Sequence, residues 1–249
     1  MLLIAKKLEG YKLIARDGAL GKVKDFYFDG DHWNVRYIIV DTGGWITGRQ
    51  VLIPTQAIEP VMPEKEEFVV SLSRQQVKDS PGIEEDPPVS RQAEQELLVY
   101  YGWTPYWGGG VGMGAAGIGV PPVIPERAAR TNPPAAIPGG ETSVRSTHEV
   151  TGYGIHATDG DIGHVEDFLL DPNTWSIAYV VVDTRNWLPG GRKVLISPRW
   201  VSDVNWADRA VSVDLTRESI KASPEFDLSK PFTGEHSERL FAHYGRLGL

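Results

Sequence analysis

The hydrophobic and polar positions of this chain predict short β-strands through most of its length, and the pattern occurs twice. In the first copy, residues 21–28 predict a strand with one buried face, and the β-branched and aromatic run at 33–40 predicts a strand buried on both faces. Further short strands are expected at 50–54, 57–61 and 67–72. Five or six short strands joined by tight turns favour a small barrel or a tight sandwich.

The second copy repeats the first almost position by position. When residues 10–42 are set against residues 152–184, 15 of the 33 pairs are identical. The strands that end the second copy are expected at 192–196 and 210–215. A duplication this clear predicts two similar domains in tandem.

Each copy closes with predicted helices. Ser73 and Thr216 stand at the N-cap of a short helical turn, and a longer amphipathic helix follows at 90–101, with Gly102 as its C-cap. The matching helix of the second copy is expected at 233–244. We expect these tail helices to cover an open barrel edge or to bridge to the other copy.

The predicted organisation is therefore mainly β, with two tandem small β-barrels, each followed by a short C-terminal helix. The first repeat with its tail helix covers residues 1–103, and the second covers residues 147–249. Residues 104–146 between them are rich in glycine and proline, a composition that is typical of a linker.

Composition excludes some classes of function and leaves others open. The net charge is −8 and neither repeat has a surplus of basic residues, which argues against a dedicated nucleic-acid binder. The chain has no cysteine, which excludes disulfides and thiolate metal sites. No signal peptide is recognised, and no run of about 18 apolar residues predicts a membrane span. We expect a cytoplasmic protein, and the lack of cysteine suits a bacterial one.

Three motifs follow one another in the first repeat and return in similar form in the second. They are Asp17-Gly-x-x-Gly21-x-Val-x-Asp25-Phe, Trp33-x-Val-x-Tyr-x-x-Val-Asp41 and Val51-Leu-Ile-Pro54. Over residues 2–81 and 147–224 the chain thereby resembles the PRC-barrel domain, a family named for the cytoplasmic domain of the photosynthetic reaction-centre H subunit. A similar barrel forms the C-terminal half of a ribosome-maturation factor.

This resemblance implies an adaptor or scaffold that binds another protein and catalyses no reaction. We therefore expect no cofactor and a protein partner that the sequence does not identify. We also expect the two barrels to pair as a pseudo-dimer, and the chain could in addition form homo-oligomers. Two alternatives follow from the same resemblance: an RNA- or ribosome-associated factor, and an accessory protein similar to the reaction-centre subunit. From the sequence we expect neither the membrane helix of that subunit nor the N-terminal domain of the ribosome factor.

Acidic residues recur at matching positions of both repeats and have two interpretations. They could be metal ligands or an acid–base pair, or they could accept hydrogen bonds from backbone groups at turns and strand ends. We expect the second, because no further type of catalytic residue accompanies them. The residues concerned are Asp17, Asp25, Asp41, Asp159, Asp167 and Asp183.

A metal-dependent enzyme is the remaining alternative. His156 and His164 lie close in sequence with Asp161 between them, and a hairpin could place the two rings opposite each other. Repeat one has Ile14 and Lys22 at the two histidine positions, so such a site would belong to repeat two alone. We expect surface histidines without a metal and assign no catalytic residue.

Five aromatic residues are candidates for contact with a partner. Trp45 and Trp187 lie in glycine-containing loops at matching places of the two repeats. Trp103, Tyr106 and Trp107 follow the first tail helix, where they predict either an arm packed on its own barrel or a docking segment. These residues are our predicted partner-binding surface.

Overall fold

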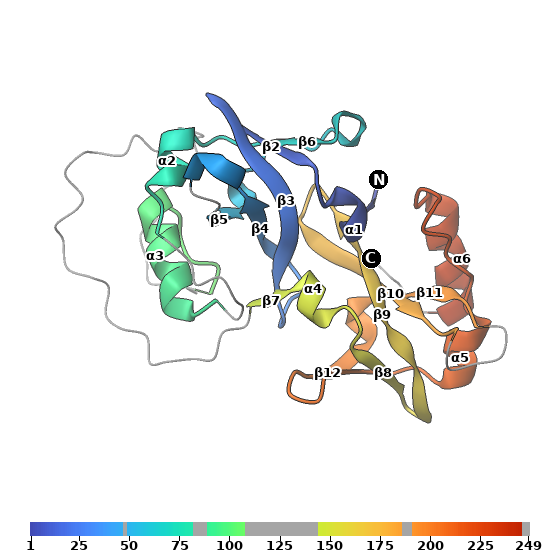
Figure 1. Cartoon of the computed structure of the whole chain (residues 1–249). Helices are drawn as coiled ribbons and strands as arrows, with labels where there is room; N and C mark the ends of the chain where they lie inside the picture. The colour runs from blue at the N-terminus through green and yellow to red at the C-terminus, as the bar shows by residue number, and fades with distance from the viewer. Residues whose placement is uncertain (47–48, 82–88, 108–143, 186–190, 246–249) are drawn as a thin grey trace, which may run out of the picture.

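The computed structural model describes residues 1–46, 49–81, 89–107, 144–185 and 191–245. Within these ranges the chain forms two β-sheets, one centred on each repeat, and helices flank the pair on both sides (Figure 1). None of the helices in the described ranges is long and apolar enough to cross a membrane.

The sheet of repeat one has the strand order β5-β4-β3-β2-β6, and β7 pairs with β3 beside this path. Its strands are β2 (Lys12–Ala15), β3 (Gly18–Asp29), β4 (Val35–Asp41), β5 (Gln50–Pro54), β6 (Glu67–Val69) and β7 (Val144–Ser146). Its helical segments are η1 (Gly43–Ile46), η2 (Thr55–Ala57), η3 (Pro63–Lys65), α2 (Arg74–Lys78) and α3 (Arg91–Tyr101). The predicted strand at 57–61 is reduced to an isolated bridge between Ile58 and Val70, next to Pro60.

The sheet of repeat two has the order β11-β10-β9-β8-β13-β12, with β1 paired to β9. Its strands are β1 (Leu3–Ile4), β8 (Gly154–Ala157), β9 (Gly160–Asp171), β10 (Ser176–Asp183), β11 (Lys193–Ile196), β12 (Val201–Asn205) and β13 (Ala210–Val213). The helical segments that belong to it are α1 (Ala5–Leu8), η5 (Pro198–Trp200), α5 (Arg217–Ala222) and α6 (Gly234–Tyr244), and α4 (Thr147–Val150) follows β7.

The N-terminal strand of each repeat is paired with the sheet of the other repeat. β1 pairs with β9, where Leu3 lies opposite Leu170, and β7 pairs with β3, where Ser146 lies opposite Tyr27. Residues 144–146, which the sequence assigns to the linker, are thus a strand of the first sheet. This exchange makes the two barrels a pseudo-dimer within one chain, because neither sheet is complete without the other repeat.

The turn before β4 and the turn before β10 join the repeats along the pseudo-twofold axis. Trp33 and Trp175 have left-handed backbones, with φ of 58° and 56°, which is uncommon for a bulky residue. The amide of Val35 donates to the carbonyl of Trp175 at 2.7 Å, and that of Ile177 donates to the carbonyl of Trp33 at 2.8 Å. These reciprocal hydrogen bonds across the repeats compensate for the strained conformation.

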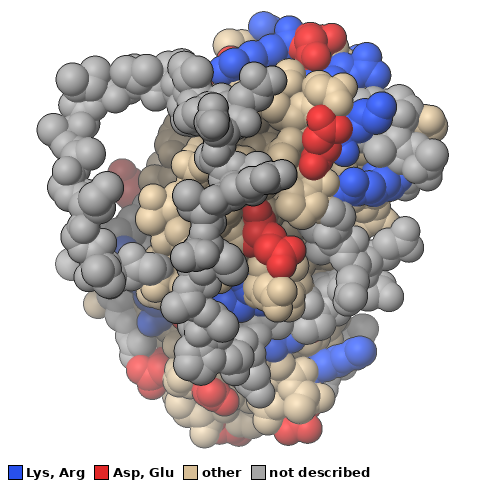
Figure 2. Space-filling view, turned by 90° about the vertical axis from the view of Figure 1, so that its left-hand side faces the viewer, with Lys and Arg blue, Asp and Glu red and all other residues tan. Residues whose placement is uncertain are grey.

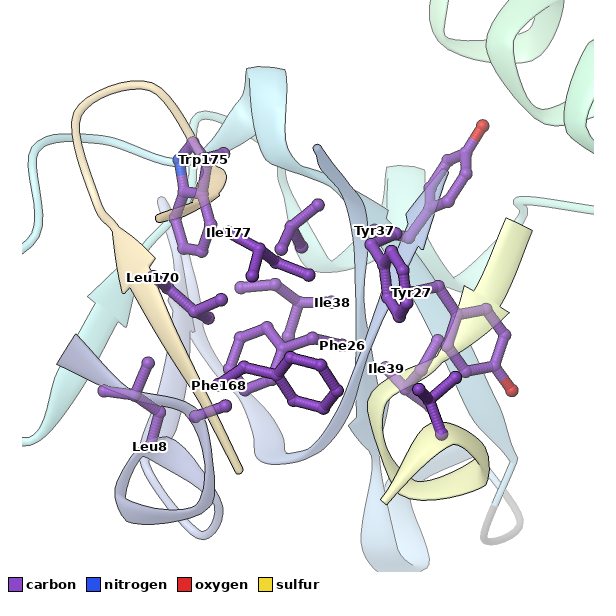
Figure 3. Close-up of a cluster of buried hydrophobic side chains, with 14 of the residues drawn as sticks. Leu8, Phe26, Tyr27, Tyr37, Ile38, Ile39, Phe168, Leu170, Trp175 and Ile177 are labelled. Carbon is purple, nitrogen blue, oxygen red and sulfur yellow. The ribbon is translucent and has the colours of Figure 1, made fainter. Parts of the chain in front are cut away.

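One hydrophobic core extends through both repeats (Figure 3). Phe28 and Phe168 contact each other with ring centroids 5.9 Å apart, and Phe68 of repeat one lies 5.9 Å from Trp175 of repeat two. Tyr37 and Tyr179, at matching positions of the two repeats, are each 1% exposed. Removal of a ring from either of the two pairs that join the repeats would therefore weaken the contact between them as well as one barrel.

The tail helices form where the sequence predicts them. The hydroxyl of Ser90 accepts from the amide of Ala93 at 3.1 Å, and Gly102 ends α3 in the left-handed conformation with φ of 74°. Each tail helix lies on the outer side of its own repeat, α3 beside β4 and β5 and α6 beside β10 and β11 (Figure 1). Of the two roles expected for the tail helices, the structure shows the first: each helix covers its own barrel and does not bridge to the other repeat.

Candidate functional site

A cleft of about 480 Å³ opens where the two repeats meet. We call it the junction cleft. One wall consists of residues 34–37 at the start of β4 with residues 54–60, and the other of the turn Pro172–Trp175 of repeat two. Leu98 of α3 and Tyr106 complete it. Residues of both repeats line the cleft, so it exists only because the two barrels are joined at the turns that contain Trp33 and Trp175.

Arg36 is held rigidly in the wall of this cleft. Its Nε donates to Oδ2 of Asp29 at 2.6 Å, and Asp29 is 1% exposed. The other face of the guanidinium lies over the ring of Tyr106, with Cζ 3.9 Å from the ring centroid. A buried carboxylate on one side and an aromatic ring on the other thus fix the orientation of the arginine.

Glu94 is a fully buried carboxyl group behind the cleft. Tyr106 donates from its hydroxyl to Oε1 of Glu94 at 3.0 Å, and Nη1 of Arg91 lies 3.5 Å from Oε2. Burial raises the pKa of Glu94 to about 7, although Arg91 and the hydroxyl of Tyr106 act in the opposite direction. The tail of repeat one is therefore attached to its barrel through a polar network that includes a titratable group.

The aromatic arm after α3 packs on its own repeat. Trp103 stacks on Tyr101 with centroids 5.0 Å apart, and Trp107 meets the edge of Tyr106 at 4.6 Å. Trp103, Tyr106 and Trp107 are all partly buried. Of the predicted partner-binding residues whose side chains the structure describes, Tyr106 lines the junction cleft.

The positions of the other two predicted contact residues, Trp45 and Trp187, relative to the junction cleft are not described. The backbone of Trp45 belongs to η1, but its side chain lies outside the described residues, as does the whole of Trp187. Their role in partner binding stays a prediction.

The duplicated acidic residues accept hydrogen bonds from backbone groups. Oδ1 of Asp17 accepts from the amide of Arg74 at 2.7 Å, and Asp159 accepts equally from Arg217 at the start of α5. Asp41 accepts from the amide of Gly43 at 2.8 Å. These three residues thus fix turns and helix starts, as the structural interpretation of the sequence predicts.

Asp25 and Asp167 have a larger role, because they hold the exchanged segments. Asp25 accepts from the hydroxyls of Ser146 and Thr147, the latter at 2.6 Å, and from the amide of His148 at 3.3 Å. Asp167 accepts from the amide of Lys6 at 3.2 Å. Each aspartate therefore binds the first turn of the short helix, α4 or α1, that follows the exchanged strand.

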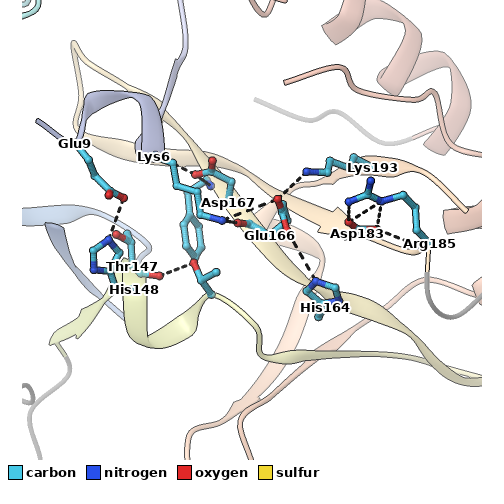
Figure 4. A network of polar contacts seen from close by, with 12 residues as sticks. Lys6, Glu9, Thr147, His148, His164, Glu166, Asp167, Asp183, Arg185 and Lys193 are labelled. Carbon is cyan, nitrogen blue, oxygen red and sulfur yellow. Dashed lines mark hydrogen bonds and ion pairs between the residues drawn. The ribbon is translucent and has the colours of Figure 1, made fainter. Parts of the chain in front are cut away.

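Side-chain contacts strengthen this crossing between the repeats (Figure 4). Nε2 of His148 lies 2.9 Å from Oε1 of Glu9, and the ammonium of Lys6 donates to the carbonyl of Glu166 at 2.5 Å. Lys193 contacts Oε1 of Glu166 at 2.6 Å. The polar residues at the crossing are engaged with one another and contribute to the joint.

The predicted metal candidates do not form one cluster in the described part of the chain. His156 pairs with Asp161, with Nδ1 and Oδ1 2.5 Å apart. His164 instead lies near Glu166 and Asp183, whose ligand atoms fall within 4.8 Å of one another.

That second group has the donor types of a metal site, but its carboxylates already have cationic partners. Lys193 contacts Glu166 at 2.6 Å, and the guanidinium of Arg185 binds Asp183 and lowers the pKa of that carboxyl group. A cation would have to displace both side chains, so the group fits an ion-pair network better than a metal centre.

Sequence reasoning missed the residues that make the junction cleft polar. Arg36 interrupts the apolar run of β4, and Glu94 lies on the same helical face as Leu97, Leu98 and Tyr101. The corresponding residues of repeat two are Ala178 and Ser237. The sequence signal that could have identified these residues is a charged residue at a core position in one repeat with an uncharged residue at the matching position of the other.

Comparison with known families gives one result that covers most of the chain. A family model described as the PRC-barrel domain matches residues 3–76 and 145–220. No curated protein matches the chain. The two matched segments begin within β1 and β7, so each includes the strand that the structure shows exchanged.

Proposed function

The chain belongs to the PRC-barrel family, with one domain in each repeat, and from this premise we propose that it is a non-catalytic adaptor whose junction cleft binds a protein partner. The observation that carries this proposal is the position of the cleft at the seam between the repeats, where residues of both domains line it. A partner seated there would contact both domains at once.

The lining suits a segment of polypeptide. Asn34, Thr55, Gln56, Asn173 and Thr174 offer neutral hydrogen-bonding groups beside apolar positions such as Ile58, Leu98 and Trp175. Neutral amides and hydroxyls around an apolar floor match the peptide groups and side chains of an extended chain. The charge of Arg36 is already balanced by Asp29.

The charge of the surrounding surface supports a protein partner over a polyanion. On the side of the molecule that carries α2 and α3, basic side chains gather along the upper and upper right-hand edge, and acidic side chains are interspersed among them and among further basic ones below (Figure 2). Nucleic acids bind to a continuous basic patch or stripe, and the acidic side chains on this side interrupt such a patch.

The test is site-specific photo-crosslinking in the full-length protein. A photoreactive amino acid replaces Thr174, an exposed residue of the cleft, and in a control replaces Lys221, an exposed residue of α5 outside it. We expect one protein to be crosslinked at position 174 and not at position 221. That protein is then purified, and its affinity for the unmodified chain is measured.

A cleft variant gives the quantitative comparison. Thr174→Arg places a bulky charged side chain at the mouth of the cleft and is expected to weaken binding of the purified partner at least tenfold, whereas Lys221→Glu leaves it within twofold. Equal affinity of both variants would refute the cleft as the binding site. Turnover of a small molecule by the purified chain would refute the non-catalytic role.

A further inference from the structure

A second cleft, of about 500 Å³, lies in repeat two between the start of β11, the segment before α6, and α6 itself. We call it the basic cleft. Its cationic side chains are Arg185, Arg192, Lys193, Lys230 and Arg239, joined by His236. Two acidic residues, Glu225 and Asp227, also line it. Such a collection is unexpected in a protein whose net charge is −8.

Three of these cations have ion-pair partners, and two do not within the described residues. Arg185 binds Asp183, Lys193 binds Glu166, and Lys230 lies 3.5 Å from Asp227. Arg192 and Arg239 make no ion pair in the described ranges. Their guanidinium groups therefore carry the charge that is available to a ligand.

The backbone on both sides of the cleft is fixed. Arg192 donates its amide to Oγ1 of Thr184 at 3.0 Å, and its carbonyl accepts from the amide of Thr184 at 3.0 Å. The amide of Phe226 donates to the carbonyl of Lys193 at 2.8 Å. Leu240, the neighbour of Arg239, is buried under α6. The arginines thus project from anchored segments, which reduces the entropy that binding must overcome.

Repeat one lacks several of these cations in its sequence. Gly43, Gln50 and Glu96 stand at the positions of Arg185, Lys193 and Arg239. The one shared cation, Arg49 at the position of Arg192, donates from Nη2 to the carbonyl of Ser80 at 2.7 Å. Arg49 thus binds within the fold of repeat one, whereas its counterpart Arg192 faces the cleft in repeat two.

We propose that the basic cleft binds a small oligophosphate anion, either inorganic or as part of a phosphate ester. Guanidinium groups bind phosphate oxygens in pairs of parallel hydrogen bonds, which suits Arg192 and Arg239. Phe226 and Leu228 supply an apolar floor. This site is separate from the junction cleft and does not depend on the adaptor role.

Isothermal titration calorimetry of the full-length protein tests the proposal. The probes are sodium tripolyphosphate, inorganic phosphate and ADP, each at 50 and 300 mM NaCl. We expect saturable binding of tripolyphosphate at one site, at least tenfold weaker binding of inorganic phosphate, and a marked loss at the higher salt concentration. The ratio of the ADP and tripolyphosphate affinities distinguishes an ester ligand from an inorganic one.

Matched variants locate the site. Arg239→Glu introduces a glutamate, the residue that α3 carries at the matching position. Arg239→Glu and Arg192→Ala are each expected to weaken tripolyphosphate binding about tenfold or more. Lys221→Glu makes the same charge change on α5, outside the cleft, and should stay within twofold. Thermal unfolding confirms that each variant is folded. No saturable binding by the wild-type chain, or equal losses in Arg239→Glu and Lys221→Glu, would overturn the proposal.

Discussion

The two crossings that exchange the N-terminal strands have the same backbone but differ in their hydrogen bonds. At the first crossing, Asp25 accepts from two hydroxyls and an amide of the exchanged segment. At the second, Asp167 accepts from the amide of Lys6, and Ile4 and Ala5 stand where the first crossing has Ser146 and Thr147. A duplicated fold can therefore keep its topology while one copy loses most of the polar contacts of a buried carboxylate.

The tails of the two repeats show a similar divergence. In repeat one, Glu94 lies buried behind the junction cleft and binds Tyr106. In repeat two, Ser237 takes the position of Glu94, and Phe232 packs against Tyr179 with ring centroids 5.3 Å apart. The two repeats thus differ in the charged residues that they carry at matching places, and the two clefts follow this difference.

The largest expected effect comes from removing each crossing aspartate in turn. Asp25→Ala leaves the hydroxyls of Ser146 and Thr147 without their acceptor and should lower the free energy of unfolding by roughly 3 kcal/mol. Asp167→Ala loses fewer partners and relieves a buried charge, so it should cost about 1 kcal/mol or less. Urea unfolding of both variants measures the difference. Equal losses would show that the hydroxyls contribute nothing to the crossing.

A smaller effect is expected from neutralising Asp167. Burial raises the pKa of Asp167 to about 6, above its unfolded value near 4. The native state therefore binds a proton more tightly than the unfolded state, and the ionised carboxylate destabilises the protein above pH 6. Asp167→Asn keeps an acceptor for Lys6 and should be roughly 1–3 kcal/mol more stable than wild type at pH 8.

The pH dependence identifies the cause of that gain. As the pH falls through 6, wild-type Asp167 takes up its proton, so the stability difference should shrink and disappear below about pH 4. Asp25→Asn is the matched control and should be destabilising at pH 8, because its amide nitrogen cannot accept from Ser146. A gain for Asp167→Asn that is constant from pH 4 to 8 would contradict this account.

The smallest effect is expected when one hydroxyl of the first crossing is transferred to the second. Ala5 occupies the position of Thr147, and Ala5→Ser offers a donor to Asp167 with little added volume. We expect a gain of about 0.5 kcal/mol at pH 7 and a lower pKa of Asp167, followed by NMR titration of its carboxyl carbon. An unchanged pKa would mean that the new hydroxyl does not reach the carboxylate.

Much of the fold could be predicted from the sequence because its signals are local. A one-sided apolar pattern identified β3, a continuous β-branched and aromatic run identified β4, and the caps Ser73, Ser90 and Gly102 marked the helices. Gly21 and its partner Gly163 mark places where a Cβ would collide with the carbonyl of Asp41 or Asp183. Such restraints act within a few residues or between adjacent strands, and a single chain displays them directly.

The exchange of strands and the clefts could not be predicted in this way. The segments at 3–4 and 144–146 have the same apolar pattern whichever sheet they join, so periodicity does not reveal the partner. The junction cleft combines Arg36, Tyr106 and Trp175, which are far apart in sequence and meet only through the packing of the two repeats. The basic cleft depends on which cations have internal partners, a property of the folded chain.

The exchanged strands also bear on how such a protein arises. A gene that encoded a single copy of this domain would yield a polypeptide whose first strand has no place in its own sheet. Two such polypeptides would each donate that strand to the other and assemble as a symmetric homodimer. Fusion of the two genes then makes a dimer that cannot dissociate on dilution, and it frees the two former subunits to diverge.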